Sequence, residues 1–478
     1  MQASKAGIAK VIGAAMGAVV VTAALIVAGC TAASNFVSNV STVGASTTSV
    51  PVSITDAPGD QVVAASLTLN SVVLTDQKNQ TTSILAAPLT FEAAHLDAVQ
   101  EPLLTSAIPQ DNYTSVTLTY SNAEVVYIDP TTKQLVVATA TLANSSQVFT
   151  FPTPLAVNNT STSLIIDFLV ANSVSISGTT VTVTPQFHIA PAPIAATPTN
   201  GTNGLMTGIR GKVSALGTNQ FTLINPEGLS VVIDVNSGTQ YQGLTGFSAL
   251  AIGALVEADV QIESNASLLA LRVEEQVPPN ATAELLIGPV TAVTGSPATS
   301  FTQVVRQQVG TPASTTPIQK DTITVTGSTQ FVLPGQFANL VTAGVPFTPT
   351  FNASTLFAGQ AVAVQTSGVT NNAATAQTVF LAPQTVSGTI TGGAAPTCAS
   401  CWGSLTLTLP SGSWLATVTG QSTVTVILPG GIQALPGATA ATSSVVRFNG
   451  FLFKSNGVLT LVAVVEGPPP GTPIGPTI

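Results

Sequence analysis

Apolar and polar residues alternate with a period of two along most of the chain beyond residue 50. Examples are Leu67 and Leu69, and then Val116, Leu118 and Tyr120. A period of two places successive side chains on opposite faces of a strand, so each run predicts a strand with one buried face. The dominance of this period predicts an all-β protein.

One segment departs from this pattern. Phe91 to Ala107 carries apolar residues at helical spacing, interrupted by Pro102, and predicts one short or broken helix. The rest of residues 51–191 contains runs for about eight strands, with local turns and no βαβ spacing. We therefore predict an antiparallel β-sandwich for residues 51–191.

Beyond residue 207 the chain repeats itself loosely. Each unit opens with a glycine and a short strand, at Gly211, Gly288 and Gly388. The unequal spacing of these glycines indicates insertions in loops, so each unit predicts a small OB-like β-barrel rather than one turn of a solenoid. The predicted barrel repeats are residues 208–276, 286–384 and 385–467.

The first 29 residues have a different character. Lys5 and Lys10 precede and flank an uncharged apolar run that ends in small residues before Cys30. This arrangement predicts a lipoprotein signal peptide over residues 1–29, helical in its apolar part, with the lipid attached to Cys30. The alternative is an uncleaved transmembrane anchor, since the run nearly reaches the roughly 20 residues that cross a bilayer. The small residues and the cysteine favour the lipoprotein.

Segments without periodicity separate these units. Residues 30–50 are rich in Ser, Thr and Ala and predict a flexible tether, and residues 192–207 predict a linker of Pro followed by Gly. Residues 468–478 predict a disordered tail. Thr31, where retained lipoproteins carry Asp, implies by resemblance to such proteins an outer-membrane location if the host has two membranes.

Charge is scarce and unevenly distributed. Only 6% of the residues are charged, the formal net charge is −9, and residues 51–191 hold ten acidic residues against Lys78 and Lys133. An acidic surface disfavours nucleic acid, whose binding depends on Lys and Arg contacts to phosphate. We expect neutral polymers such as envelope polysaccharide, envelope proteins or cations as partners, besides the membrane reached through the lipid.

The remaining two cysteines form a close pair. Cys398 and Cys401 predict a local disulfide in an oxidising compartment, while a redox role would need a βαβ context that the sequence lacks. A zinc site at this pair would need further ligands, and the only histidines, His95 and His188, lie far away in the sequence. We therefore expect no zinc and no resident cofactor.

No sequence motif of a hydrolase, metalloprotease, P-loop or dinucleotide enzyme occurs, and we expect a non-catalytic protein. The best catalytic candidates are Asp167 and His188, which would act as base and orienting partner in a hydrolase of envelope polymers. Asp56 and Asp60 flank a turn and are candidate calcium ligands of an adhesion module. The structural alternatives are a turn stabilised by its own Asp side chains and a buried Asp that satisfies a donor.

Two tryptophans, Trp402 and Trp414, lie within a charge-free stretch, close to the cysteine pair. Exposed tryptophans stack on sugar rings, and OB-like barrels bind oligosaccharides on one face, so both are candidate ligand-binding residues. The alternative is that both belong to a core.

The first domain contains four characteristic motifs: Val52–Asp60, Ile108–Val116, Leu164–Phe168 and Phe187–Pro191. These motifs resemble domain-of-unknown-function family 4382, although Asp111 and Asn112 replace its usual glycine. The barrel repeats are similar to domain-of-unknown-function family 5666, whose members are small β-barrels of the OB type. The resemblance implies an exported lipoprotein without an established activity. Taken together, the sequence predicts a lipid-anchored envelope protein that acts as a binding or display module.

Overall fold

A computed structural model describes most of the chain and confirms the all-β class. The described residues are 46–56, 59–96, 99–158, 162–194, 204–280, 282–310, 318–334, 337, 344–394, 396–398, 401–429, 444–455 and 457–467. The predicted signal helix, Cys30 and the tail 468–478 lie outside them. Among the described helices, none has the length and apolar character needed to cross a membrane.

The N-terminal domain is a sandwich of two main sheets around one core. The first sheet has the order β13-β10-β1-β5, and the second has the order β3-β2-β6-β7 with β4 beside β2 and β9 beside β6. The strands of these sheets are β1 (Thr47–Asp56), β2 (Val62–Asp76), β3 (Thr81–Ser83), β4 (Leu89–Glu92), β5 (Glu101–Pro109), β6 (Asp111–Ile128), β7 (Leu135–Thr139), β9 (Ser146–Val157), β10 (Thr162–Phe168) and β13 (Phe187–Pro193). A small third sheet contains β8 (Thr141–Leu142), β11 (Val174–Ser177) and β12 (Thr180–Val183), and α1 (Val170–Ser173) precedes it.

The alternating residues noted in the sequence lie on the two faces of long strands. Leu67 and Leu69 of β2 and Val116 and Leu118 of β6 are fully buried in the core. Most strand pairs are antiparallel, but β1 pairs with β10 in parallel, and β8 pairs with β12 in parallel. One main sheet and the small third sheet are therefore mixed.

The helix predicted for Phe91–Ala107 is wrong. This segment forms the end of β4, a single 3₁₀ turn η1 (Ala94–Leu96) and most of β5. Pro102 cannot donate a helical hydrogen bond, and β5 instead pairs with β1 along its length. Pairing with a neighbouring strand outweighs the weak helical spacing of the apolar residues.

Three repeat units follow, which we name barrels 1 to 3 after the predicted repeats, and their strands share one connectivity. Barrel 1 contains β14 (Leu205–Gly217), β15 (Gln220–Ile224), β16 (Ser230–Asp234), β17 (Gln240–Gln242), η2 (Phe247–Ala249), β18 (Leu255–Ile262) and β19 (Leu268–Val277). Barrel 2 contains β20 (Glu284–Thr294), β21 (Ser300–Val305), β22 (Gln307–Val309), β23 (Gln319–Thr324), β24 (Gln330–Val332), β25 (Ala361–Thr366), β26 (Ala373–Thr375) and β27 (Thr378–Leu381). Barrel 3 contains β28 (Gln384–Ala394), β29 (Trp402–Thr408), α3 (Trp414–Thr419), β30 (Thr423–Pro429), β31 (Val445–Ser455) and β32 (Val458–Gly467).

Barrel 3 is closed, in the order β28-β29-β30-β32-β31. Barrel 1 has the same order in β14-β15-β16-β19-β18, because β16 also pairs with β19 in parallel. Barrel 2 repeats the parallel pairing of its third strand, β23, with β26, the first half of its last strand. This common order, with a parallel pair between the third and fifth strands, supports the interpretation of the three units as repeats.

Strands extend into the tether and into the linker that the sequence predicted. β1 begins at Thr47, inside the tether predicted for residues 30–50, because Thr47–Val50 pairs with β5. β13 extends to Pro193 and β14 starts at Leu205, so both ends of the linker predicted for residues 192–207 are strand. Strand pairing holds these residues despite their polar or Pro-rich composition.

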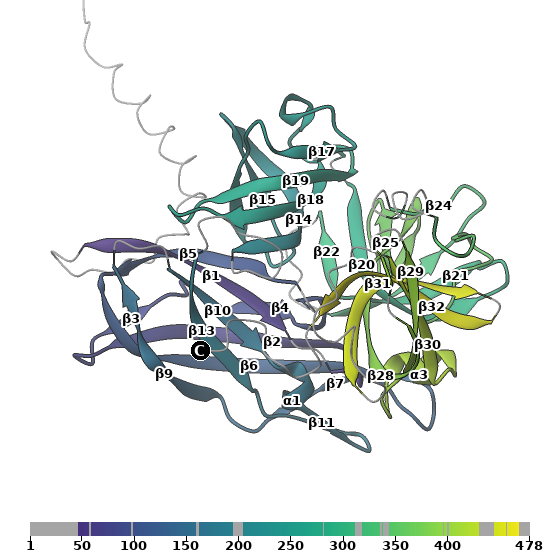
Figure 1. Ribbon diagram of the computed structural model, residues 1–478, viewed down its shortest axis with the longest axis horizontal. Coiled ribbons are helices and arrows are strands. Elements are labelled where there is room, and N and C mark those ends of the chain that lie inside the picture. The colour runs from purple at the N-terminus through teal and green to yellow at the C-terminus, as the bar shows by residue number, and fades with distance from the viewer. Residues whose placement is uncertain are drawn as a thin grey trace, which may run out of the picture.

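Figure 1 shows how the units are arranged. Barrel 1 lies above the N-terminal sandwich, and barrels 2 and 3 lie together at its right-hand end. Barrels 2 and 3 share one hydrophobic core, and smaller cores join barrel 2 to barrel 1 and to the sandwich. The described domains therefore contact one another through side chains.

Candidate functional site

The predicted catalytic pair lies on neighbouring strands. Asp167 of β10 and His188 of β13 are direct cross-strand partners, so their side chains share one face of the sheet. Asp167 is fully buried, and burial also lowers the pKa of the half-buried His188. The structure thus brings together two residues that sequence reasoning paired only by chemistry.

The predicted calcium ligands are used by the fold. Asp56 is fully buried at the end of β1, where its Oδ1 accepts the backbone N–H of Val170 at 3.0 Å. The backbone carbonyl of Asp60 accepts the N–H of Trp414 at 2.8 Å. The side-chain contact favours the structural interpretation of Asp56, whereas the backbone contact leaves the role of the Asp60 side chain open, and calcium binding stays a prediction.

The two tryptophans occupy different positions in barrel 3. Trp402 opens β29 and packs, partly buried, against the core shared with barrel 2. Trp414 opens α3 and packs between barrel 3 and the N-terminal sandwich. Neither is among the exposed large hydrophobic residues. Their partial burial supports the core interpretation.

Cys398 and Cys401 form the expected disulfide, with their Cα atoms 5.0 Å apart.

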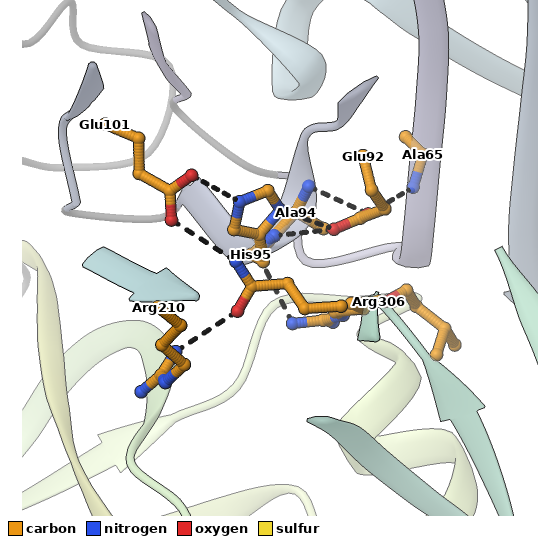
Figure 2. Close-up of polar contacts among 9 residues, drawn as sticks. Ala65, Glu92, Ala94, His95, Glu101, Arg210 and Arg306 are labelled. Carbon is orange, nitrogen blue, oxygen red and sulfur yellow. Dashed lines mark hydrogen bonds and ion pairs between the residues drawn. The ribbon is translucent and has the colours of Figure 1, made fainter. Parts of the chain in front are cut away.

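A site that sequence reasoning missed lies where the sandwich meets barrels 1 and 2. It is a histidine–carboxylate cluster of Glu92, His95, Glu101 and Glu227. Glu92 ends β4 and His95 lies in η1, while Glu101 opens β5. Figure 2 shows the imidazole between the carboxylates of Glu92 and Glu101.

Glu92 fixes the position of His95. Its Oε1 accepts the backbone N–H groups of Ala65 and Ala94 at 2.9 Å, and its Oε2 accepts that of His95 at 2.8 Å. The same Oε2 lies 3.2 Å from His95 Nδ1. Glu92 therefore caps the 3₁₀ turn and directs His95 Nε2 toward Glu101, whose Oε2 is 3.4 Å away.

Residues of the barrels complete the surroundings. Gln307 Nε2 of barrel 2 donates to Glu101 Oε1 at 3.2 Å, and Arg210 of barrel 1 donates to the side-chain oxygen of Gln307. Arg306 donates to the backbone carbonyls of Val63 and Ala94. Polar contacts from three units thus converge on one buried place (Figure 2).

Glu227 reaches the cluster from the turn between β15 and β16. Asn225 shapes this turn, because its side-chain oxygen accepts the N–H of Leu229 at 2.7 Å and its carbonyl accepts that of Gly228. Gly228 has a φ of +80°, which a glycine adopts without strain. A cavity of about 10 Å³, roughly the space of one water molecule, is lined by His95, Glu101 and Glu227 among others.

The acidic surroundings perturb two groups of the cluster. Burial by itself lowers the pKa of His95, but charge attraction and hydrogen bonding from Glu101 and then Glu92 outweigh it and raise the pKa to about 10. Burial and then repulsion by Glu101 raise the pKa of Glu227 to about 7. Protons held on these two groups are one way to neutralise the cluster.

One imidazole nitrogen and two carboxylates are also a donor set for a divalent ion. One ligand atom each from His95, Glu101 and Glu227 lies within 4.8 Å of the others. Sequence reasoning missed the set because Glu227 belongs to a different domain. The available signal was local: Glu92, His95 and Glu101 form a dense group of ionisable residues in a chain that contains only two histidines.

Comparison with known families identifies two parts of the chain. Residues 47–185 match the family described as domain of unknown function DUF4382. Residues 210–274, which lie within barrel 1, match domain of unknown function DUF5666. The order of the two domains is the predicted one. No curated protein matches the chain significantly. The cluster therefore lies where the segment that matches DUF4382 meets the segment that matches DUF5666.

Proposed function

We propose that this protein is a lipid-anchored cell-envelope protein whose β-domains act as a non-catalytic binding or display module, with envelope polysaccharide as the ligand class. The observation that carries the proposal is the joining of the sandwich and barrels through shared cores and buried polar contacts. Such joining suits a module that presents one continuous surface. Anchoring rests on the apolar run before Cys30.

Charge supports this ligand class. From Asp321 to Arg447 no intervening residue is charged, so most of the surface of barrel 3 relies on hydroxyl and amide groups. Neutral polar groups of this kind suit hydrogen bonding to sugar hydroxyls. An acidic chain with few Lys and Arg disfavours nucleic acid.

Two measurements test the proposal. Replacement Cys30→Ala should move the protein from the membrane fraction to the soluble fraction and abolish labelling by a fatty acid. The full chain in mild detergent should be retained, saturably, by cell-wall or exopolysaccharide fractions of the host. Absence of retention by every fraction would exclude the polysaccharide and direct the search to protein partners.

The facing positions of Asp167 and His188 favour a second candidate, an envelope-polymer hydrolase. In this function Asp167 would orient His188, which would act as general base. His188→Asn at unchanged stability should abolish release of reducing ends from the polymer fractions. Release by the wild type that persists in this variant would remove His188 from the reaction.

Calcium separates a third function from the other two. A calcium-stabilised adhesion module should gain thermal stability with calcium and lose that gain after Asp60→Asn, which leaves the buried Asp56 in place. A melting temperature that ignores calcium would end this hypothesis.

A further inference from the structure

The histidine–carboxylate cluster contains a donor arrangement that the proposed function does not use. His95 and Glu101 come from the sandwich, and Glu227 comes from barrel 1. The His95 side chain is 7% exposed, and its Nε2 lies 3.4 Å from Glu101 Oε2, a contact too long for a well-formed hydrogen bond. One oxygen of Glu227, Oε2, is buried without a hydrogen bond within the described residues. We propose that His95, Glu101 and Glu227 bind one divalent transition-metal ion, of which zinc is the type, between the two domains.

The distance between the first two ligands suits a metal better than a hydrogen bond. Charge-assisted hydrogen bonds between nitrogen and carboxylate oxygen are about 2.7–2.9 Å long. His95 Nε2 and Glu101 Oε2 are 3.4 Å apart. Two ligands at about 2.1 Å from a tetrahedral ion lie about 3.4 Å from each other. The pair therefore has the spacing of two ligands on one ion.

Neighbouring side chains hold His95 and Glu101 in place, as the residues around a metal site usually do. A metal-bound histidine usually donates its other ring N–H to a carboxylate, and here Glu92 Oε2 lies 3.2 Å from His95 Nδ1. The Oε1 of Glu101 is held by Gln307, which leaves Oε2 facing the imidazole. Glu92 and Gln307 are thus positioning residues, and the small cavity lined by His95, Glu101 and Glu227 has room for about one water-sized occupant.

The identity of the donors selects the class of ion. Calcium and magnesium take oxygen ligands, whereas imidazole suits zinc, copper, iron and nickel. Three buried carboxylates are also costly without positive charge. With His95 neutral, one divalent ion and Arg306 together balance Glu92, Glu101 and Glu227. The competing arrangement is protonation of His95 and Glu227, without metal.

The test is metal binding by the full chain, purified in mild detergent and stripped with a chelator. Zinc alone is added, and bound zinc per chain is measured after gel filtration. We expect one equivalent for the wild type. Glu227→Gln, which keeps the size of the side chain, should weaken zinc binding at least about 100-fold, and Glu92→Gln about 10- to 100-fold. Glu263→Gln, a matched substitution on barrel 1 outside the cluster, should bind like the wild type.

Cobalt is a second probe, because its absorption spectrum distinguishes this site from other metal-binding sites. Co²⁺ in this nitrogen and oxygen set should give visible d–d absorption without the intense near-ultraviolet band of thiolate ligands. Circular dichroism of each variant checks that it is folded. Wild-type protein that takes up no zinc, or a Glu227→Gln variant that binds zinc as tightly as the wild type, would overturn the proposal in favour of the protonated cluster.

Discussion

Two interfaces of this protein are built from opposite kinds of residue. Where the sandwich meets barrels 1 and 2, the histidine–carboxylate cluster, Arg306 and Gln307 make buried polar contacts. Where barrel 2 meets barrel 3, an aromatic interface is formed by Phe337, Phe347, Phe451 and Phe453, with ring centroids 5.2–5.5 Å apart. One interface depends on directed contacts and the other on apolar area.

The comparison of the two interfaces shows what buried charges contribute in a protein that has few charged residues. Buried charges cost free energy unless they are paired, so they define one arrangement of their neighbours when they are satisfied. Apolar contacts are strong but less directional. The polar interface therefore depends on the balance of charges and on single hydrogen bonds, whereas the aromatic interface depends on packing.

The largest effect is expected at the aromatic interface. Phe451 is fully buried and contacts the ring of Phe337. Phe451→Ala should lower the free energy of unfolding by about 3–5 kcal/mol, because it removes apolar contacts and leaves a cavity. Denaturant unfolding measures the loss, and Val458→Ala, at a position that is 44% exposed, is the control. A loss below about 1 kcal/mol would show that the barrels do not depend on this ring.

The polar interface should respond next. Arg306 donates from Nε to the carbonyl of Val63 at 2.7 Å and from Nη1 to that of Ala94 at 3.3 Å. Arg306→Met keeps most of the apolar stem but leaves two buried carbonyls without these donors, so we expect a loss of about 2–4 kcal/mol. The same denaturant measurement applies. If Arg306→Met costs as little as Val458→Ala, the guanidinium contacts do not hold the interface.

A buried acid in barrel 2 allows a test of how a buried carboxyl group without hydrogen-bond partners affects stability. Asp321 is fully buried, neither carboxylate oxygen has a hydrogen-bond partner among the described residues, and burial followed by repulsion from Glu284 raises its pKa to about 6. The folded protein holds this proton more tightly than the unfolded chain. The resulting stabilisation is complete below about pH 4 and is lost as the pH rises through about 6.

Asp321→Asn should therefore stabilise the protein at pH 8, by at most about 3 kcal/mol, and this gain should vanish near pH 4. Melting temperatures of both proteins across this pH range measure the effect. A difference that does not change with pH would mean that the carboxyl does not titrate in this window.

The smallest effect is expected at the disulfide. Cys398 and Cys401 are three positions apart and close a very short loop, so reduction restores little chain entropy to the unfolded state. We expect a loss of at most about 2 kcal/mol. Thermal unfolding with and without reductant measures it, and the Cys401→Ser variant should be insensitive to reductant. A larger loss would indicate that the loop braces the aromatic interface next to Trp402.

The sequence predicted the structure best where apolar residues alternated regularly and where motifs were repeated. The alternation over Leu67–Leu69 and Val116–Tyr120 predicted the strands of the sandwich, and the glycine-led units predicted the repeats. The prediction was wrong for Phe91–Ala107, because pairing of β5 with β1 decided the structure of a segment whose local pattern was ambiguous. The adjacent cysteines were paired correctly, since their proximity in sequence ensures proximity in space.

By itself the sequence determined the β class, the order of the two domain families and the close cysteine pair, because these follow from local periodicity, motifs and spacing. Only the tertiary structure decided which charges meet. Glu227 reaches His95 and Glu101 because the turn after β15 lies against η1 and β5, and no local pattern encodes that contact between domains. Long-range packing brought together residues of two domains that lie far apart in the sequence.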